Sequence, residues 1–239
     1  MRILAIESSA KAASVALVQD GKLVSQYFQA STLTHSRTLL KMAEDLLDNL
    51  ELKLKDVDTI AVAKGPGSFT GIRIGVAAAK GLCWGGDIPV CGVSTLEAMA
   101  YQLIDREGAV ICPAMDARRS EIYNAKFMAE GGKLIRLCED RAISIEQLKE
   151  EAKNDRKPYF FVGDGAYLCY NAFLEELLTA YIPPEPLLLQ SAWGVACAAQ
   201  GKAAEQAFDL APNYLRLSQA ERERLEKEKD NITGGTTNG

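Results

Sequence analysis

An Asp-Gly pair between two apolar runs constrains the fold of this chain more than any other sequence feature. Asp20-Gly21 separates a partly alternating run at 13–19 from an apolar run at 22–28. The two-residue turn of a tight hairpin needs positive φ at both central residues, which Asp and Gly accept readily. Another short apolar run lies at 3–8. The sequence therefore predicts that the chain opens with three antiparallel strands.

Helices and strands alternate after this meander. Apolar residues spaced three and four apart predict a helix over 34–50, and Gly65-Pro66-Gly67 is a breaker before a second helix over 68–84. Strands are predicted at 57–63 and 88–93, and a capping box at 94–97 opens a helix to about residue 106. The first half is thus predicted as β-β-β-α-β-α-β-α.

The second half is predicted to repeat this order. Its predicted strands are 109–115, 121–128, 133–139, 158–162 and 187–189, and its predicted helices are 144–153, 166–180 and 191–208. Two tandem copies make an α/β protein of two RNase H-like lobes with mixed sheets and a cleft between them, the layout of actin, Hsp70 ATPases and sugar kinases. We expect lobes at 1–107 and 108–218 and a charged, flexible tail at 219–239. Within the second range, 211–216 is expected to be a docking segment.

The composition is typical of a soluble globular protein. The 239 residues are 48% hydrophobic and 25% charged, with a formal net charge of −5 at pH 7. No apolar run is long enough to span a bilayer, and Glu7 interrupts the first apolar run too early for a signal peptide, so we expect a cytoplasmic protein with no membrane contact. The acidic surplus disfavours stand-alone nucleic-acid binding, because phosphate contacts need a basic surface.

Few residues are available for metal or nucleophilic chemistry. His35 is the only histidine, which excludes a site needing two His ligands. The six cysteines form no C-x-x-C pair, so we expect reduced and mostly buried thiols. His35 lies at the start of a predicted helix, and we expect a structural role for it there.

Two polar motifs lie where strands meet the predicted cleft. They comprise Glu7, Ser8 and Ser9 in the first lobe, and Asp116, Arg118 and Glu121 in the second. Carboxylate and hydroxyl oxygens suit a hard cation, and arginines suit anions, so we predict a vestigial nucleotide or anion site. A polar strand end and a structural ion-pair turn are the alternatives, because no glycine loop accompanies Asp116.

Four small residues recur four apart in the segment that opens the second predicted helix. They are Gly67, Gly71, Gly75 and Ala79, and the segment lacks the G-x-x-x-x-G-K-[ST] spacing of a phosphate loop. A stripe without large side chains lets another backbone approach closely. We expect Gly71 and Gly75 to lie at a crossing with a partner helix. Packing on the chain's own sheet is the alternative.

Six segments span almost the whole chain in a fixed order. They are LAIESS, THSRTLL, AVAKGPGSFTGIRIGVAAAKGL, GVSTLEAMA, MDARRSEIY and PNYLR. Together they resemble the bacterial TsaB (YeaZ) family over about residues 1–217, with Glu7 standing where many of its members carry Asp. The resemblance implies a non-catalytic scaffold or dimerisation subunit in the machinery that makes N6-threonylcarbamoyladenosine at position 37 of tRNAs reading codons that start with A.

The resemblance also implies partners and a binding surface. It implies direct binding to the catalytic relative TsaD, contact with TsaE and tRNA through the complex, a functional link to TsaC, and a homodimer when TsaD is absent. ATP and metal belong to the partners, so no cofactor is expected in the isolated subunit. The implied partner-binding residues are Ser36, Leu39, Leu40, Ala43, Leu47, Phe69, Thr70, Gly71, Ile72, Arg73, Gly75, Val76 and Ala79.

Two other functions remain as alternatives. A kinase-like, ATP-binding enzyme of the actin and sugar-kinase fold needs a second phosphate loop, which we do not find around Asp116 in the sequence. A glycoprotease-like peptidase needs a metal or nucleophile constellation, and a single histidine leaves little material for one.

Overall fold

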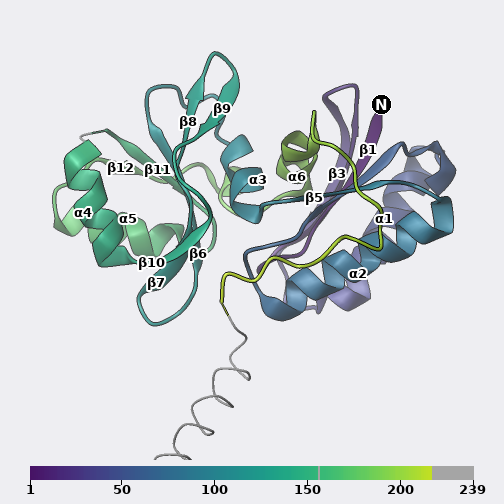
Figure 1. Ribbon diagram of the computed structural model, residues 1–239, viewed down its shortest axis with the longest axis horizontal. Coiled ribbons are helices and arrows are strands. Elements are labelled where there is room, and N and C mark those ends of the chain that lie inside the picture. Colours follow the sequence, from purple (N-terminus) through teal and green to yellow (C-terminus); the bar gives the residue numbers. More distant parts are fainter. Residues whose placement is uncertain (156, 217–239) are drawn as a thin grey trace, which may run out of the picture.

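The computed structural model describes residues 1–155 and 157–216, and Figure 1 shows them as two lobes, each built on one sheet. This arrangement confirms the predicted α/β fold class. The tail predicted over 219–239 lies outside the described residues. Across the described ranges, no helix is both long enough and apolar enough to cross a membrane.

The first lobe carries the predicted meander. Its strands are β1 (Arg2–Glu7), β2 (Ala13–Gln19), β3 (Lys22–Gln29), β4 (Thr59–Ala63) and β5 (Val90–Val93). Asp20 and Gly21 turn between β2 and β3 with φ of 51° and 79°, as predicted. The sheet order is β3-β2-β1-β4-β5, with antiparallel pairs in the meander and parallel pairs from β1 onward. The parallel strands therefore end at one edge, where their following loops gather.

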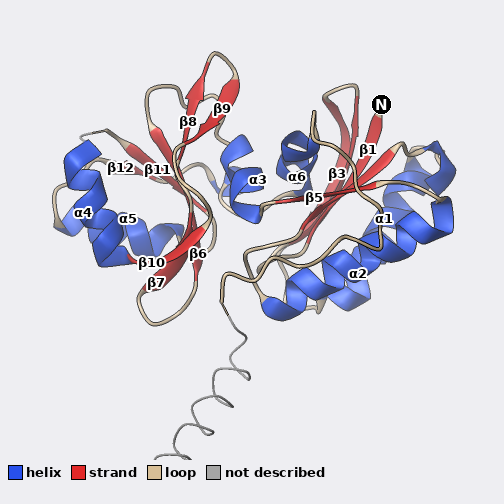
Figure 2. Ribbon diagram, viewed as in Figure 1, coloured by secondary structure: helices blue, strands red, loops and turns tan. Residues whose placement is uncertain are grey.

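Helices cover both faces of this sheet (Figure 2). α1 (His35–Asn49) and α2 (Phe69–Gly86) cover one face and α6 (Ala192–Ala199) covers the other, while α3 (Thr95–Tyr101) packs between α6 and the second sheet. Alternate side chains of β1 join different layers, because successive strand residues point to opposite faces. Leu4 and Ile6 pack with α1 and α2, whereas Ile3 and Ala5 pack with α6.

The second sheet repeats the strand order of the first. Its strands are β6 (Val110–Asp116), β7 (Glu121–Asn124), β8 (Phe127–Glu130), β9 (Lys133–Arg136), β10 (Arg141–Ser144), β11 (Tyr159–Val162) and β12 (Ala180–Tyr181). The path β10-β7-β6-β11-β12 has the same antiparallel and parallel steps as β3-β2-β1-β4-β5. The β8–β9 hairpin is additional, and α4 (Ile145–Asp155) and α5 (Ala166–Glu175) complete this lobe.

The single strand predicted over 121–128 is two strands, because its partner β6 contains a proline. β7 and β8 face β6 in one continuous register. Pro113 lies opposite the gap between them and has no N–H to donate to a ladder. The Asn124 side chain donates instead to the carbonyl oxygens of Pro113 and Ala125, at 3.1 and 3.0 Å.

Several other predicted boundaries in this region are wrong. The segment 187–189 is not a strand; the 3-10 turn η2 (Glu185–Leu187) lies there, and β10 was not predicted. α5 ends at Glu175, five residues before the predicted end, and Leu177 adopts a φ of 55°. α6 ends before Gly201, which has a φ of 76° and is a typical helix terminator.

α6 packs on the first sheet although its residues follow the second lobe. Its alanines share a core with Ile3 and Ala5, and a Cβ atom on Gly194 would lie 2.1 Å from the carbonyl oxygen of Ala98 in α3. Conversely, α3 precedes the second lobe in the chain but packs on its sheet, because Leu96 belongs to a core with residues of β6 and β8. The expected division into 1–107 and 108–218 therefore separates the two sheets but not the helices.

Candidate functional site

The glycine stripe of α2 faces the end of β1. A Cβ atom on Gly71 would lie 2.2 Å from the carbonyl oxygen of Ser8, and one on Gly75 would lie 2.4 Å from Ser8 Oγ. Ser8 Oγ also donates to the Gly71 carbonyl oxygen at 2.9 Å. The expectation that these glycines lie at a crossing with a partner helix is therefore wrong. The alternative, packing on the chain's own sheet, is what the structure shows.

The opposite face of α2 is open to solvent. Residues two positions apart on a helix point about 200° apart, so the face away from the glycine stripe begins at Arg73. Arg73, Ala77, Gly81 and Trp84 are all exposed, and we call them the outer stripe of α2. Nothing lies within 4 Å of a Cβ atom on Gly81, and Trp84 is 70% exposed.

An apolar groove runs between α1, α2 and the 3-10 turn η1 (Leu54–Asp56). Its volume is about 630 Å³, and it is lined by Leu40, Lys41, Ala43, Glu44, Leu47, Asp48, Leu52, Lys53, Leu54 and Leu82. Leu40 is 51% exposed at this groove. Leucines form most of its apolar lining, while lysines and acids supply charge of both signs. Leu82 belongs to α2, so the groove adjoins the helix that carries the outer stripe.

The predicted partner-binding residues separate into an exposed and a buried group. Ser36, Leu40, Thr70 and Arg73 are exposed, and Phe69 is half-buried. Leu39, Ala43, Leu47, Gly71, Ile72, Gly75, Val76 and Ala79 are buried in the chain's own core. Ala77, Gly81 and Trp84 are also exposed on α2, and the prediction did not include them. The helical period carried that signal, because it assigns them to the face opposite the buried stripe.

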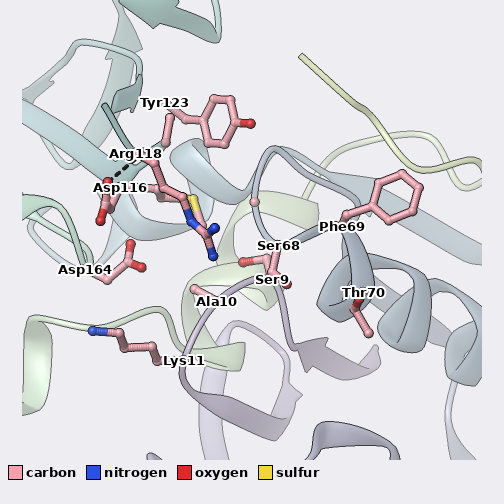
Figure 3. A pocket seen from close by; sticks show the side chains of 13 residues that line it. Ser9, Ala10, Lys11, Ser68, Phe69, Thr70, Asp116, Arg118, Tyr123 and Asp164 are labelled. Carbon is pink, nitrogen blue, oxygen red and sulfur yellow. Dashed lines mark hydrogen bonds between the residues drawn. The ribbon is translucent and has the colours of Figure 1, made fainter. Parts of the chain in front are cut away.

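A hollow of about 600 Å³ lies between the lobes (Figure 3). It is lined by Ser9, Ala10, Lys11, Gly67, Ser68, Phe69, Thr70, Met115, Asp116, Ala117, Arg118, Tyr123 and Asp164. Most of these residues come from equivalent places, after β1 and β6 and in the turns that follow β4 and β11. Figure 3 shows the Arg118 side chain extending into the hollow toward the side of Ser9 and Ser68.

Only some of the predicted cleft residues line this hollow. Those that do are Ser9, Asp116 and Arg118. Glu7 and Ser8 are buried in the sheet and do not line it. Glu121 is also outside the lining and forms an ion pair with Arg216 at 2.5 Å. The predicted six-residue site is therefore not assembled in one place.

The prediction missed a second-lobe loop. Gly163-Asp164-Gly165 follows β11, as Gly65-Pro66-Gly67 follows β4. A Cβ atom on Gly163, whose φ is 111°, would lie 2.4 Å from the carbonyl oxygen of Ala114. An acid between two glycines after a predicted strand was visible in the sequence. Asp164 lies 48 residues from Asp116 in the sequence, and only the pairing of β6 with β11 brings the two loops together.

Burial raises the pKa of two carboxyl groups near the hollow. Burial raises the pKa of Glu7 to about 7, against a hydrogen bond of 2.6 Å from the Ser9 N–H to Glu7 Oε1 that lowers it. Burial also raises the pKa of Asp164. Ser9 Oγ and Asp164 Oδ1 have no hydrogen-bond partner among the described residues. Both atoms belong to residues that line the hollow, which makes it a polar site.

Histidine and cysteine occupy structural positions. His35 begins α1, and its Nε2 lies 2.7 Å from the Ala10 carbonyl oxygen, so the predicted structural position is confirmed. All six cysteines are free, and burial raises the pKa of thiols such as Cys83 and Cys169. Over 1–155 and 157–216, no group of three His, Cys, Asp or Glu residues is placed to hold a metal ion.

The two lobes and the hollow between them define the general class of the chain. A family model described as TsaD, tRNA N6-adenosine threonylcarbamoyltransferase, matches residues 29–224. The chain is therefore a two-lobed protein of the TsaD class.

Individual relatives narrow this class. The chain is 32% identical to the tRNA threonylcarbamoyladenosine biosynthesis protein TsaB of Bacillus subtilis (strain 168), over 96% of this chain and 100% of that one. It is 41% identical to TsaB of Escherichia coli (strain K12), over 54% of this chain and 56% of that one. The solved structure of YeaZ from Pseudomonas aeruginosa matches with a TM-score of 0.75 and 28% identity, over 90% of this chain and 99% of that one. The chain belongs to the TsaB (YeaZ) family.

Proposed function

We propose that the chain is a non-catalytic, partner-binding subunit in the biosynthesis of tRNA threonylcarbamoyladenosine. In this proposal the chain binds TsaD directly and contacts TsaE and tRNA only within the complex. TsaC supplies the activated threonylcarbamoyl group that the complex uses. The single observation that carries the proposal is the outer stripe of α2 beside the apolar groove. The proposal places the chain in the cytoplasm and leaves ATP and metal to its partners.

The composition of this surface supports a protein partner. Trp84 and Leu40 are large apolar side chains with exposures of 70% and 51%. Aromatic anchors beside an apolar pocket are typical of the residues that dominate binding energy at interfaces. Ala77 and Gly81 are small and exposed, which lets a partner helix approach the α2 backbone closely. The proposal includes a homodimer when TsaD is absent, in which the same surface of a second copy takes the place of TsaD.

The proposal is tested by charge substitution on the surface. Leu40→Asp should weaken association with TsaD from the same organism at least ~tenfold, because the carboxylate loses its water when the interface closes. The matched control is Leu168→Asp on α5, where Leu168 is 46% exposed on the other lobe. Sedimentation velocity of mixtures measures both. Equal affinity of wild type and Leu40→Asp, or equal losses in both variants, would contradict the proposal.

A second candidate function is the binding of a small anionic ligand, such as a nucleotide, in the hollow between the lobes. Lys11 and Arg118 bring positive charge to its lining, and Ser9 Oγ is a buried polar atom without a partner among the described residues. Titration calorimetry of the isolated chain with ATP and Mg²⁺ tests it. Micromolar binding that is lost in Lys11→Ala would support this function, and no heat of binding would exclude it.

A further inference from the structure

The segment after α6 crosses the first lobe and is anchored to it at several points. Glu205 and Val90 exchange backbone hydrogen bonds of 2.7 and 3.1 Å. Leu210 is 1% exposed and belongs to the core under α1 and α2. The Asn213 N–H donates to the Lys64 carbonyl oxygen at 2.6 Å. Figure 1 shows this segment, in yellow-green, running along α2 toward the second lobe.

Tyr214 fixes the end of the segment to the start of α2. Its ring lies 4.8 Å from the Phe69 ring, centroid to centroid. Arg73 Nε donates to the Tyr214 hydroxyl at 2.8 Å, and the Arg73 guanidinium lies 3.7 Å from the Phe69 centroid. Phe69 also lines the hollow, so Tyr214 holds a residue of the first-lobe wall.

Arg216, two residues further on, reaches the second lobe. Its Nη1 lies 2.5 Å from Glu121 Oε2. Glu121 closes the turn between β6 and β7, in which its N–H donates to the Arg118 carbonyl oxygen at 3.2 Å and its own carbonyl oxygen accepts from Ala117 at 3.0 Å. Arg118 lines the hollow from the other side. The segment 213–216 therefore contacts elements of both walls of the hollow.

The turn held by Arg216 has an unfavourable backbone. Arg118, Arg119 and Ser120 have φ of 65°, 57° and 59°, a left-handed conformation in which the Cβ atom of a non-glycine residue crowds the backbone. Three consecutive left-handed residues persist only where the surroundings hold them. All three are exposed, and the turn has hydrogen bonds of its own, in which the Arg118 N–H donates to Asp116 Oδ1 at 2.7 Å.

We propose that residues 213–216 act as a clasp that holds the turn at 117–121 against the start of α2 and so sets the width of the hollow between the lobes. Release of the clasp lets the turn, with Arg118 and Asp116 beside it, move away from Phe69 and Ser68. The clasp thereby controls access to the hollow. It is a property of the isolated chain, and Arg73 belongs both to the clasp and to the outer stripe of α2.

Hydrogen exchange of the full chain, followed by mass spectrometry, tests the clasp. Arg216→Ala should raise the exchange rate of the peptide spanning 117–121 by ~tenfold, since local opening governs exchange there. Tyr214→Ala should raise it in the same peptide by at least ~threefold, although Tyr214 contacts α2 and not the turn. Lys202→Ala is the matched control, because it removes an ion pair of 2.7 Å with Glu97 and leaves the clasp intact.

Trypsin supplies a second readout, because Arg118 and Arg119 are cleavage sites in the exposed turn. We expect faster cleavage there in both clasp variants, with melting temperatures close to wild type. Unchanged exchange of the turn in Arg216→Ala would overturn the clasp. Faster exchange of the turn in Arg216→Ala, together with wild-type exchange in Tyr214→Ala, would also overturn it. That result would mean that only the local ion pair between Arg216 and Glu121 holds the turn.

Discussion

The two faces of α2 use the same kind of residue for opposite purposes. Gly71 and Gly75 face inward, where the backbone and hydroxyl of Ser8 occupy the place of a side chain. Gly81 faces outward, where a Cβ atom would meet nothing within 4 Å. The inner glycines are thus required by the fold of the chain itself. The outer one is free to serve contact with another molecule.

The comparison of the two faces shows that the spacing of small residues alone does not tell whether a helix stripe faces the chain's own core or a partner. A four-residue repeat of small residues identifies a stripe on a helix, but the stripe packs equally well on a sheet or on a partner helix. In α2 the neighbours decide between them. Ile72, Val76 and Ala79 are buried beside the inner glycines, whereas Ala77 and Trp84, about one turn to either side of Gly81, are exposed.

The largest effect on stability is expected from placing a large side chain on the inner face of α2. Gly71→Leu forces side-chain atoms into the space of the Ser8 carbonyl oxygen, and backbone at that position cannot move aside without displacing β1. We expect a loss of at least ~3 kcal/mol of unfolding free energy, enough to leave much of the chain insoluble. Soluble yield and thermal melting by circular dichroism measure it. A soluble Gly71→Leu variant with a wild-type melt would refute the assignment of this face.

The free energy of unfolding should depend on pH through Glu7, the last residue of β1, which lies behind the inner face of α2. Glu7 is buried with a pKa of about 7, above its ordinary value, so its neutral form is favoured in the folded state. The stability it supplies is complete below its unfolded pKa and is lost as pH rises through 7, by on the order of 3 kcal/mol. Glu7→Gln removes this loss.

We therefore expect the melting temperature of Glu7→Gln minus that of wild type to be higher at pH 8 than at pH 5. Melts of both proteins at the two pH values give the comparison, and the difference between them cancels the titration of all other groups. A difference that stays constant from pH 5 to pH 8 would show that Glu7 does not titrate as proposed.

The smallest effect is expected from a single methyl group on the outer face. Gly81→Ala adds it where no atom lies within 4 Å, and alanine favours the helix over glycine by ~1 kcal/mol. The variant should melt a few degrees higher than wild type, as followed by circular dichroism. A lower melting temperature would mean that Gly81 packs against the chain itself.

The first lobe was predictable because its signals are local. The Asp20-Gly21 turn, the amphipathic pattern of α1 and the Ser94 cap of α3 each depend on residues close in sequence, and each is confirmed. The second lobe was predicted less well because its decisive contacts are long-range. Pro113 divides the opposite strand through a sheet partner, which no local pattern reveals.

The candidate sites were predictable only in part, for the same reason. The two helices proposed for partner binding, α1 and α2, were predicted close to their observed bounds, but which of their faces are exposed depends on where β1 ends. The hollow needed Asp164 and Lys11, which lie far apart in sequence and meet only when β1 and β11 present their loops at facing edges. The packing of α6 on the other lobe's sheet likewise depends on the path of the whole chain.

The most direct measurement of the central claim is the affinity of Gly81→Leu for TsaD. The variant should fold and melt like wild type or slightly higher, because the added side chain lies in solvent in the free subunit. Its association, measured by sedimentation velocity against wild type, should weaken by roughly ten- to a hundredfold, because close approach of a partner helix is blocked. Wild-type affinity in a folded Gly81→Leu variant would contradict the account and place the partner surface elsewhere.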